Sequence, residues 1–292
     1  MGQVSRPRLL VIGAAGFVGQ HVARHAAPAF DVIAAGHADI DITSATSVNA
    51  GIERAAPDVV VLTAALSDID ECERQPDLAE AMNVRGAEYV ARACARRGTR
   101  LVFTSSGAVF DGTRHGYTES DPPSPVSVYG RTKAQAERFI GQEAPSALIL
   151  RLSLVIGFAE GARTNSMLNR FEAKLRAGQP VLLPDFEFRN PIDVGTLNQF
   201  LLQLLESAAA GIVHIGGTEA VSRYELGVRL AGRMGLPAHL VQPQSEPVPG
   251  RAPRGPHHFL LPDKLRAICR SPVPTCNEVI ERAIHGSSQT HS

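Results

Sequence analysis

The sequence has no excess of charge of either sign, few cysteines and no long apolar run. Its 29 basic residues balance 29 acidic ones, so nothing in the charge points to nucleic acid or to an anionic membrane surface as a partner. No uninterrupted apolar stretch approaches the roughly 18 residues that a membrane helix needs. These absences favour a globular protein that binds neither nucleic acid nor membrane.

The four cysteines indicate the compartment in which the protein works. Cys72, Cys94, Cys269 and Cys276 have neither close CxxC pairing nor histidines at zinc-ligand spacing, so we expect no metal site. Reduced thiols are typical of the cytoplasm. The apolar run at residues 9–18 imitates a signal sequence, but glycines interrupt it, and we therefore expect a cytoplasmic protein.

Short apolar runs rich in β-branched residues recur along the first half of the chain, each followed by a longer segment with helical spacing. This alternation is typical of βαβ units, and it predicts an α/β fold with a doubly wound parallel sheet of the Rossmann type. Strands are expected at residues 8–12, 31–35, 58–63, 100–104 and 147–152. Helices are expected at residues 16–27, 45–55, 78–97 and 126–143.

The pattern of the sequence changes after residue 156, where loops with proline and glycine separate the segments of helical or strand periodicity. We therefore divide the chain into a dinucleotide-binding domain at residues 1–156, a smaller mixed C-terminal lobe for the substrate at residues 157–286, and a flexible tail at residues 287–292. Residues 242–256 are expected to be ordered but irregular. In the lobe, helices are expected at residues 166–177, 194–208 and 223–234, and a strand at residues 211–215.

Three glycines stand at the junction between the first strand and the first helix. A pyrophosphate needs backbone N–H donors and the positive end of a helix there, and side chains would hold it away. Gly13 would permit the tight turn, Gly16 the close approach of the phosphate, and Gly19 the packing of helix on strand. The pattern predicts a dinucleotide site. An empty pocket that keeps its glycines for packing alone is the alternative.

The end of the second strand indicates which nicotinamide cofactor binds. An acidic residue there grips the ribose 2′-hydroxyl and repels a 2′-phosphate. The strand ends in Ala35, Gly36 and His37, and the nearest carboxylates, Asp39 and Asp41, lie a few residues further on. The sequence therefore favours NADP (NADPH), with His37 as a cation near the 2′-phosphate. NAD, and a surface histidine with no specific role, are the alternatives.

Tyr129 and Lys133 lie four residues apart at the start of a helical segment, so they share one helix face. An adjacent ammonium favours the ionised phenol, which we expect to bring the pKa of Tyr129 down from about 10 towards a usable range. The tyrosine would then exchange a proton with a carbonyl oxygen as hydride moves. Ser105 and Ser106 end a strand upstream, where ligands bind in such folds; satisfying a turn is their alternative role.

With these motifs in this order, the sequence resembles the extended short-chain dehydrogenases/reductases, and most closely the dTDP-4-dehydrorhamnose reductase family. The resemblance covers most of the chain. It is carried by the glycine loop at residues 13–19, by Asp41-Ile-Thr43, Pro57-Asp-Val-Val60, Ala64-Ala65, Asp70 with Glu73, Asn83-Val-Arg-Gly86, Val109-Phe-Asp-Gly112, Tyr117-Thr-Glu119, Asp121-Pro-Pro123 and Ser127-Val-Tyr-Gly-Arg-Thr-Lys133.

The resemblance implies roles for individual residues. Ser106, three residues before Val109, occupies the catalytic serine/threonine position, beside the catalytic Tyr129 and Lys133. Lys133 would also hold the nicotinamide ribose, and Asp41 and Ile42 would approach the adenine. The full set of expected cofactor-binding residues is Gly13, Gly16, Phe17, Val18, Gly19, His37, Asp41, Ile42, Ala64, Ala65, Leu66, Ser105, Tyr129 and Lys133.

Departures from the family bear on the substrate. The family usually follows the catalytic hydroxyl with an acidic residue and a tyrosine, but here Gly107 and Ala108 follow, and the tryptophan expected beside the substrate is absent from the whole chain. A different or more open pocket is implied. Besides Ser106, the residues expected to bind substrate are Arg189, Arg251 and Arg254. A salt bridge from Arg189 to Asp185 or Glu187 is the alternative.

The resulting hypothesis is an NAD(P)H-dependent reductase of a keto group, acting on a nucleotide-activated deoxysugar as its small-molecule partner. One alternative is an NAD-dependent nucleotide-sugar epimerase or dehydratase, whose usual acid at the end of strand two is absent. Another is a non-catalytic NADP-binding regulatory subunit similar to that of methionine adenosyltransferase, against which the intact Ser106, Tyr129 and Lys133 count. The chain could also form a homodimer, a point that the sequence leaves open.

Overall fold

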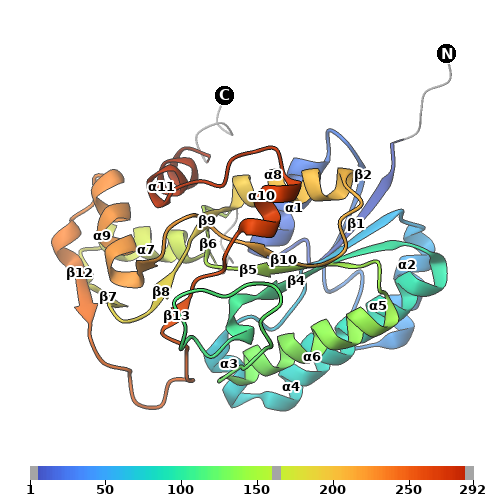
Figure 1. Cartoon of the computed structure of the whole chain (residues 1–292), viewed down its shortest axis with the longest axis horizontal. Coiled ribbons are helices and arrows are strands. Elements are labelled where there is room, and N and C mark those ends of the chain that lie inside the picture. The colour runs from blue at the N-terminus through green and yellow to red at the C-terminus, as the bar shows by residue number, and fades with distance from the viewer. Residues whose placement is uncertain (1–5, 160–165, 287–292) are drawn as a thin grey trace.

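A parallel sheet of six strands forms the centre of the computed structural model, which describes residues 6–159 and 166–286 (Figure 1). Its strand order is β10-β5-β4-β3-β1-β2, and every neighbouring pair is parallel. The apolar strand sequences fit a sheet covered on both faces. The strands are β1 (Arg8–Ile12), β2 (Asp31–Ala35), β3 (Val59–Leu62), β4 (Arg100–Ser106), β5 (Leu148–Leu152) and β10 (Gly211–Ile215).

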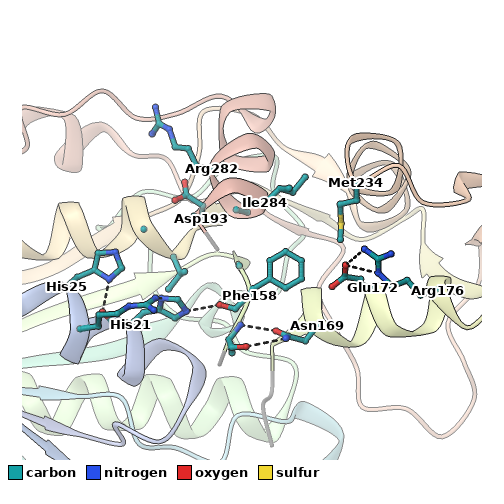
Figure 2. A pocket seen from close by; sticks show the side chains of 17 residues that line it. His21, His25, Phe158, Asn169, Glu172, Arg176, Asp193, Met234, Arg282 and Ile284 are labelled. Atoms are coloured by element: carbon teal, nitrogen blue, oxygen red, sulfur yellow. Dashed lines mark hydrogen bonds and ion pairs between the residues drawn. The ribbon is translucent and has the colours of Figure 1, made fainter. Parts of the chain in front are cut away.

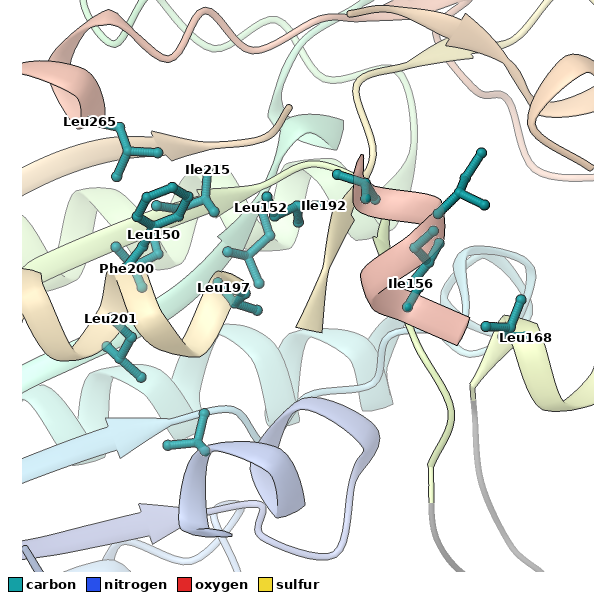
Figure 3. Close-up of a cluster of buried hydrophobic side chains, with 14 of the residues drawn as sticks. Leu150, Leu152, Ile156, Leu168, Ile192, Leu197, Phe200, Leu201, Ile215 and Leu265 are labelled. Carbon is teal, nitrogen blue, oxygen red and sulfur yellow. The ribbon is translucent and has the colours of Figure 1, made fainter. Parts of the chain in front are cut away.

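Helices cover both faces, and successive side chains of each strand enter different cores. On one face α2 (Ala45–Ala55), α5 (Gly86–Arg97) and α6 (Val128–Glu143) pack on residues such as Leu10 and Leu62. On the other face α1 (Phe17–Ala26) and α8 (Val194–Glu206) lie side by side over residues such as Leu9 and Val61. Figure 3 shows part of this second core, where Leu150 and Leu152 of β5 meet Leu197, Phe200 and Leu201 of α8. The predicted doubly wound fold is confirmed.

The segment after residue 156 contributes to the main sheet as well as to a smaller lobe. The strand predicted at residues 211–215 does form, but it belongs to the main sheet and not to the lobe, because β10 pairs with β5. The remaining strands form small sheets in the orders β11-β8-β13, β12-β7 and β6-β9. They are β6 (Val155–Ile156), β7 (Val181–Pro184), β8 (Phe188–Arg189), β9 (Ile192–Asp193), β11 (Val221–Ser222), β12 (Val241–Gln244) and β13 (His257–His258). The helices here are α7 (Met167–Arg176), α9 (Arg223–Arg233), α10 (Asp263–Ile268) and α11 (Cys276–His285).

The helix expected at residues 78–97 is broken into three parts. Pro76 occupies the first turn of α4 (Pro76–Glu80), residues 81–85 form a π-helical turn, and α5 follows. The wide turn carries Asn83, whose buried side chain bonds to the loop after β3. π-helical turns are frequent at functional sites. The short helix α3 (Ile69–Arg74), which the sequence did not predict, precedes this region.

Two other expectations concern the C-terminal region. Between residues 242 and 256 the chain is irregular apart from the end of β12, as expected. The tail expected at residues 287–292 lies outside the described residues.

Candidate active site

The strand order reverses between β1 and β3, and in open α/β sheets ligands bind at such a switch point. Gly13 lies there with a φ of 96°, and a Cβ on it would be 2.5 Å from the Ala64 nitrogen. A Cβ on Gly19 would be 2.2 Å from the Gly13 carbonyl oxygen, so helix and strand touch at this point. A Cβ on Gly16 would meet nothing nearer than 3.4 Å. Gly13 and Gly19 therefore serve chain packing, and Gly16 leaves space beside the N-terminus of α1.

A cavity of about 530 Å³ opens over these glycines and the carboxyl ends of β3, β4 and β5. The first turn of α1 holds no acidic residue, so its positive end favours a bound anion. The shape of the cavity and the backbone N–H donors at the start of α1 fit the pyrophosphate of a dinucleotide. The expected cofactor-binding residues that line this cavity are Gly13, Gly16, Phe17, Val18, Gly19, His37, Ile42, Ala64, Ala65, Ser105, Tyr129 and Lys133.

Asp41 and Leu66, also expected to bind cofactor, do not line the cavity. The Asp41 carboxylate accepts hydrogen bonds from the backbone nitrogen and the hydroxyl of Thr43, at 2.9 and 2.7 Å, and these bonds lower its pKa. Leu66 donates its backbone N–H to the Asn83 side-chain oxygen at 2.8 Å, and its carbonyl accepts from the Asn83 amide at 3.0 Å. Asn83 thus fixes the loop after β3. In the sequence, Asn83 stands out only as part of the segment Asn83-Val-Arg-Gly86 that resembles the family.

The carboxylate that comes nearest to the end of the second strand is that of Asp39, which does not line the cavity. Asp39 folds back so that its side-chain oxygen accepts from the Gly36 backbone nitrogen at 2.9 Å. Residue spacing alone does not predict this contact, because it depends on a turn at residues 37–39 that brings the Asp39 side chain back to Gly36. His37 is 82% exposed, and its ring nitrogen lies 4.0 Å from an Asp41 carboxylate oxygen.

The start of α6 places Tyr129 and Lys133 against the end of β4. The Ser127 hydroxyl caps the helix by accepting from the Gly130 nitrogen at 3.1 Å. A Cβ on Gly130 would be 2.1 Å from the Ala108 carbonyl oxygen, so only glycine permits so close an approach. The Lys133 ammonium donates to the Thr104 carbonyl oxygen at 2.9 Å. Burial lowers the pKa of Lys133 to about 8, while Glu137 acts in the opposite direction.

The pKa of Tyr129 shifts against the expectation. Desolvation raises the pKa of the Tyr129 phenol to about 12, although a hydrogen bond with Ser106 acts in the lowering direction. The Lys133 ammonium is directed to the Thr104 carbonyl, and it lies 5.9 Å from the centre of the Tyr129 ring. The phenol is therefore protonated at neutral pH. That state suits donation of a proton to a carbonyl oxygen during reduction.

Ser105 faces a buried network rather than offering its hydroxyl to a ligand. It donates to the Glu137 carboxylate, which also forms an ion pair with Arg151 at distances of 2.7 to 3.2 Å. The side chains of Glu137 and Arg151 are 5% and 2% exposed. Arg151 also lies over the Phe110 ring, 4.9 Å from its centre. The network ties α6 to β4 and β5 beneath Tyr129 and Lys133.

A second cavity, of about 220 Å³, meets the first at the candidate catalytic residues. Both cavities are lined by Ser106 and Tyr129, which therefore lie where they join. Gly107 and Ala108 line the second cavity, so the small residues that replace the usual acid and tyrosine leave room there. Its lining also includes Glu187, Arg189, Arg223 and Arg254.

The three arginines expected to bind substrate differ in their contacts. Arg189 donates to the Phe188 and Pro256 carbonyl oxygens at 2.7 and 3.2 Å and lies 3.4 Å from Glu187, so the salt bridge considered from the sequence is present. Burial lowers its pKa to about 10. Arg254 makes two hydrogen bonds to Asp70, at 3.0 and 2.8 Å. Arg251 lies outside the second cavity, 3.5 Å from Asp70.

Another cavity, of about 460 Å³, shares no lining residue with these two (Figure 2). It lies among α1, α7, α8 and α11, with His21 and His25 on one side and the Glu172–Arg176 ion pair on another. None of the expected site residues lines it. The residues expected to be catalytic, Ser106, Tyr129 and Lys133, therefore all line the two joined cavities.

Comparison with known proteins places this fold in a family. The family model described as "RmlD substrate binding domain" matches residues 7–288. The chain belongs to this family. It is 30% identical over 233 residues to a dTDP-4-dehydrorhamnose reductase from Aggregatibacter actinomycetemcomitans, covering 76% of this chain and 78% of that protein. The resemblance recognised from the sequence is confirmed.

Two further relatives differ from each other in kind. The chain is 29% identical to methionine adenosyltransferase 2 subunit beta of Xenopus laevis, covering 85% of this chain and 78% of that one. In structure it matches a dTDP-4-dehydrorhamnose reductase from Bacillus anthracis in complex with NADP, with a TM-score of 0.90, coverage of 98% and 100%, and 24% identity. The second likeness concerns the fold alone.

Across residues 6–159 and 166–286, no helix is long and apolar enough to cross a membrane. Over the same part of the chain, no group of three or more His, Cys, Asp and Glu side chains is arranged to hold a metal ion. All four cysteines are buried and unpaired.

Proposed function

We propose that this protein is an NADPH-dependent reductase of a keto group on a nucleotide-activated deoxysugar. The observation that carries the proposal is the position of Ser106 and Tyr129 at the junction of two cavities, one suited to a dinucleotide and one lined by arginines. The relative from Aggregatibacter is named as a reductase of such a sugar. The six-stranded sheet would carry the cofactor, and the elements after residue 157, apart from α8 and β10, would carry most of the substrate end.

The residues of the site have separate tasks in this reaction. NADPH, when bound, supplies hydride to the carbonyl carbon. Tyr129 gives its proton to the carbonyl oxygen, and the Ser106 hydroxyl donates a hydrogen bond to the same oxygen. Lys133 would hold the nicotinamide ribose through its ammonium, which donates to the Thr104 carbonyl oxygen at 2.9 Å. Asn83 and the Glu137–Arg151 pair hold these groups in position.

The cofactor preference rests on the end of β2. The Asp39 carboxylate is engaged with the Gly36 nitrogen, and His37 is exposed and able to face a 2′-phosphate. We propose tighter binding of NADPH than of NADH, with NADH as the second cofactor. Titration of cofactor fluorescence measures both affinities, and Asp39→Asn should strengthen NADPH binding. Equal or tighter NADH binding by the wild type would contradict the preference and favour the epimerase alternative.

A second candidate function is a regulatory subunit that binds NADP without catalysis. The specific observation in its favour is the 29% identity with methionine adenosyltransferase 2 subunit beta over 85% of the chain. The complete set of Ser106, Tyr129 and Lys133 favours catalysis instead. NADPH consumption with nucleotide 4-ketosugars separates the two: the reductase oxidises NADPH in proportion to ketone, and the subunit binds it without turnover.

We also propose a cytoplasmic location, because four buried, unpaired cysteines suit a reducing compartment. A homodimer stays a prediction. Sedimentation of the purified chain with and without NADPH measures its assembly state.

A further inference from the structure

A histidine faces the part of the second cavity that lies beside Ser106. Gly107 and Ala108, which follow Ser106, line this cavity but bring no polar side-chain atoms to it. A Cβ on Gly107 would lie 3.5 Å from the Cβ of His258 and 3.5 Å from both methyl carbons of Leu260. Of these two neighbours, only the histidine is polar, and His258 lines the same cavity.

The strand β13 directs its two histidines to different places. His257 stacks on the Phe188 ring, with 4.8 Å between ring centres, and meets His115 edge-on at 4.7 Å; it does not line the second cavity. The next residue, His258, is buried and does line it. Successive side chains of a strand point to opposite faces, which explains the difference. Pairing of His258 with Arg189 in β8 fixes the position of its backbone.

The two ring nitrogens of His258 have different tasks. Nε2 lies 3.1 Å from the Phe110 carbonyl oxygen, which can only accept, so Nε2 carries a hydrogen. Burial lowers the pKa of His258 to about 3, and the nearby charge of Arg189 acts in the same direction, so the ring is neutral. Nδ1 therefore has a lone pair and can act as a hydrogen-bond acceptor.

This acceptor has no partner in the protein. Across residues 6–159 and 166–286, the side chain of His258 makes one hydrogen bond, the bond from Nε2 to Phe110. Nδ1 is not among the fully buried side-chain atoms that lack a partner, as the Ser153 hydroxyl is, so it keeps some exposed surface. The space that this side chain lines is the second cavity. A largely desolvated acceptor is stabilised when a donor binds to it.

We propose that His258 contacts the sugar ring of the substrate, where Nδ1 accepts a hydrogen bond from a hydroxyl on the carbon next to the ketone. This inference rests on the proposed function and deepens it, because it names a group that a good substrate carries. Ser106 and Tyr129 would hold the carbonyl oxygen, and Gly107, one residue further along, faces His258. A sugar without a hydroxyl at that carbon offers no donor to the neutral ring.

The direct test removes the histidine acceptor and the sugar hydroxyl separately and together. The full chain, saturated with NADP, is titrated calorimetrically with a thymidine diphosphate 4-keto-6-deoxysugar that carries this hydroxyl, and with its analogue deoxygenated at that carbon. His258→Gln keeps an N–H donor for Phe110 and removes the Nδ1 acceptor. It should weaken binding of the hydroxylated sugar by about three- to tenfold, the effect of losing one hydrogen bond between uncharged groups. Binding of the analogue should be unchanged.

Two further variants test the assignment of the nitrogens. His258→Asn places an acceptor near the position of Nδ1 and gives up the bond to Phe110. It should therefore keep the preference for the hydroxylated sugar and lower the melting temperature. His257→Gln, in the same strand, is the matched control and should leave both affinities unchanged. NADP affinity and the melting temperature show that each variant is folded.

The outcomes separate this inference from the proposed function. Equal weakening of both sugars by folded His258→Gln, or no weakening, overturns the inference even if ketosugars are reduced, because the histidine would then only shape the cavity. A loss confined to the hydroxylated sugar, without oxidation of NADPH, supports the contact and contradicts the reductase. Failure of the wild type to bind either sugar contradicts both.

Discussion

Removing the carboxylate of Glu137 is expected to destabilise the protein strongly. Glu137 and Arg151 are almost fully buried and share three short N–O contacts, and Ser105 donates to the same carboxylate. Glu137→Leu leaves the Arg151 guanidinium buried without its counter-charge. Breaking such a pair costs about 3–5 kcal/mol. For a chain of this length that corresponds to a fall in melting temperature of about 6–10 °C.

Differential scanning calorimetry or urea unfolding measures the effect, and the same helix provides the control. Glu143 pairs with Arg92 at 3.1 Å on the surface, where ion pairs contribute about 0–1 kcal/mol. Glu143→Leu should therefore change the melting temperature by about 2 °C or less. The double variant Glu137→Leu/Arg151→Met should recover part of the loss, because no unpaired buried charge remains. If Glu137→Leu is no more harmful than Glu143→Leu, the network does not hold α6 on the sheet.

Two further predictions concern the cofactor cavity. Gly19→Ala should abolish or greatly weaken NADPH binding, because its Cβ would lie 2.2 Å from the Gly13 carbonyl oxygen. The control is Gly141→Ala in α6, where a Cβ meets nothing within 4 Å. In a fluorescence titration, this control should bind NADPH normally. The ammonium of Lys133 has a pKa of about 8, so kcat/KM for reduction should fall as the pH rises through about 8 and the proton is lost. A rate that stays level to pH 10 would contradict the assignment to Lys133.

Local sequence patterns predicted the sheet well, because the run of apolar residues in each strand shows that the strand is buried. Strands at residues 8–12, 31–35 and 211–215 have the expected bounds, since apolar β-branched runs ended by turns define them directly. The placement of β10 was wrong because pairing with β5 joins residues more than 60 positions apart. Nothing in the local sequence of a short strand specifies a distant partner.

In the candidate site, too, the features set by local sequence were predicted and those set by tertiary structure were not. The glycines and the Tyr129–Lys133 pair line one cavity as expected, because each motif depends on one turn or one helix face. The pKa of Tyr129 is raised because the side chain is buried in the folded protein. The Asp39 carboxylate reaches Gly36 because of a turn. Residue spacing in the sequence encodes neither effect. Arg223 lines the second cavity, but it is not among the substrate-binding residues expected from the sequence. Its lack of strong acceptors becomes visible only when the partners of every arginine in the cavity are known.

The most direct test of the central claim is turnover by Tyr129→Phe. Wild-type protein and the variant would be compared for oxidation of NADPH with a nucleotide 4-ketosugar, and for NADPH affinity. The ring and its packing remain in the variant, so NADPH should bind almost normally. The rate should fall by about 10²–10⁴, the usual contribution of a positioned general acid. Near-normal turnover by Tyr129→Phe would contradict the mechanism.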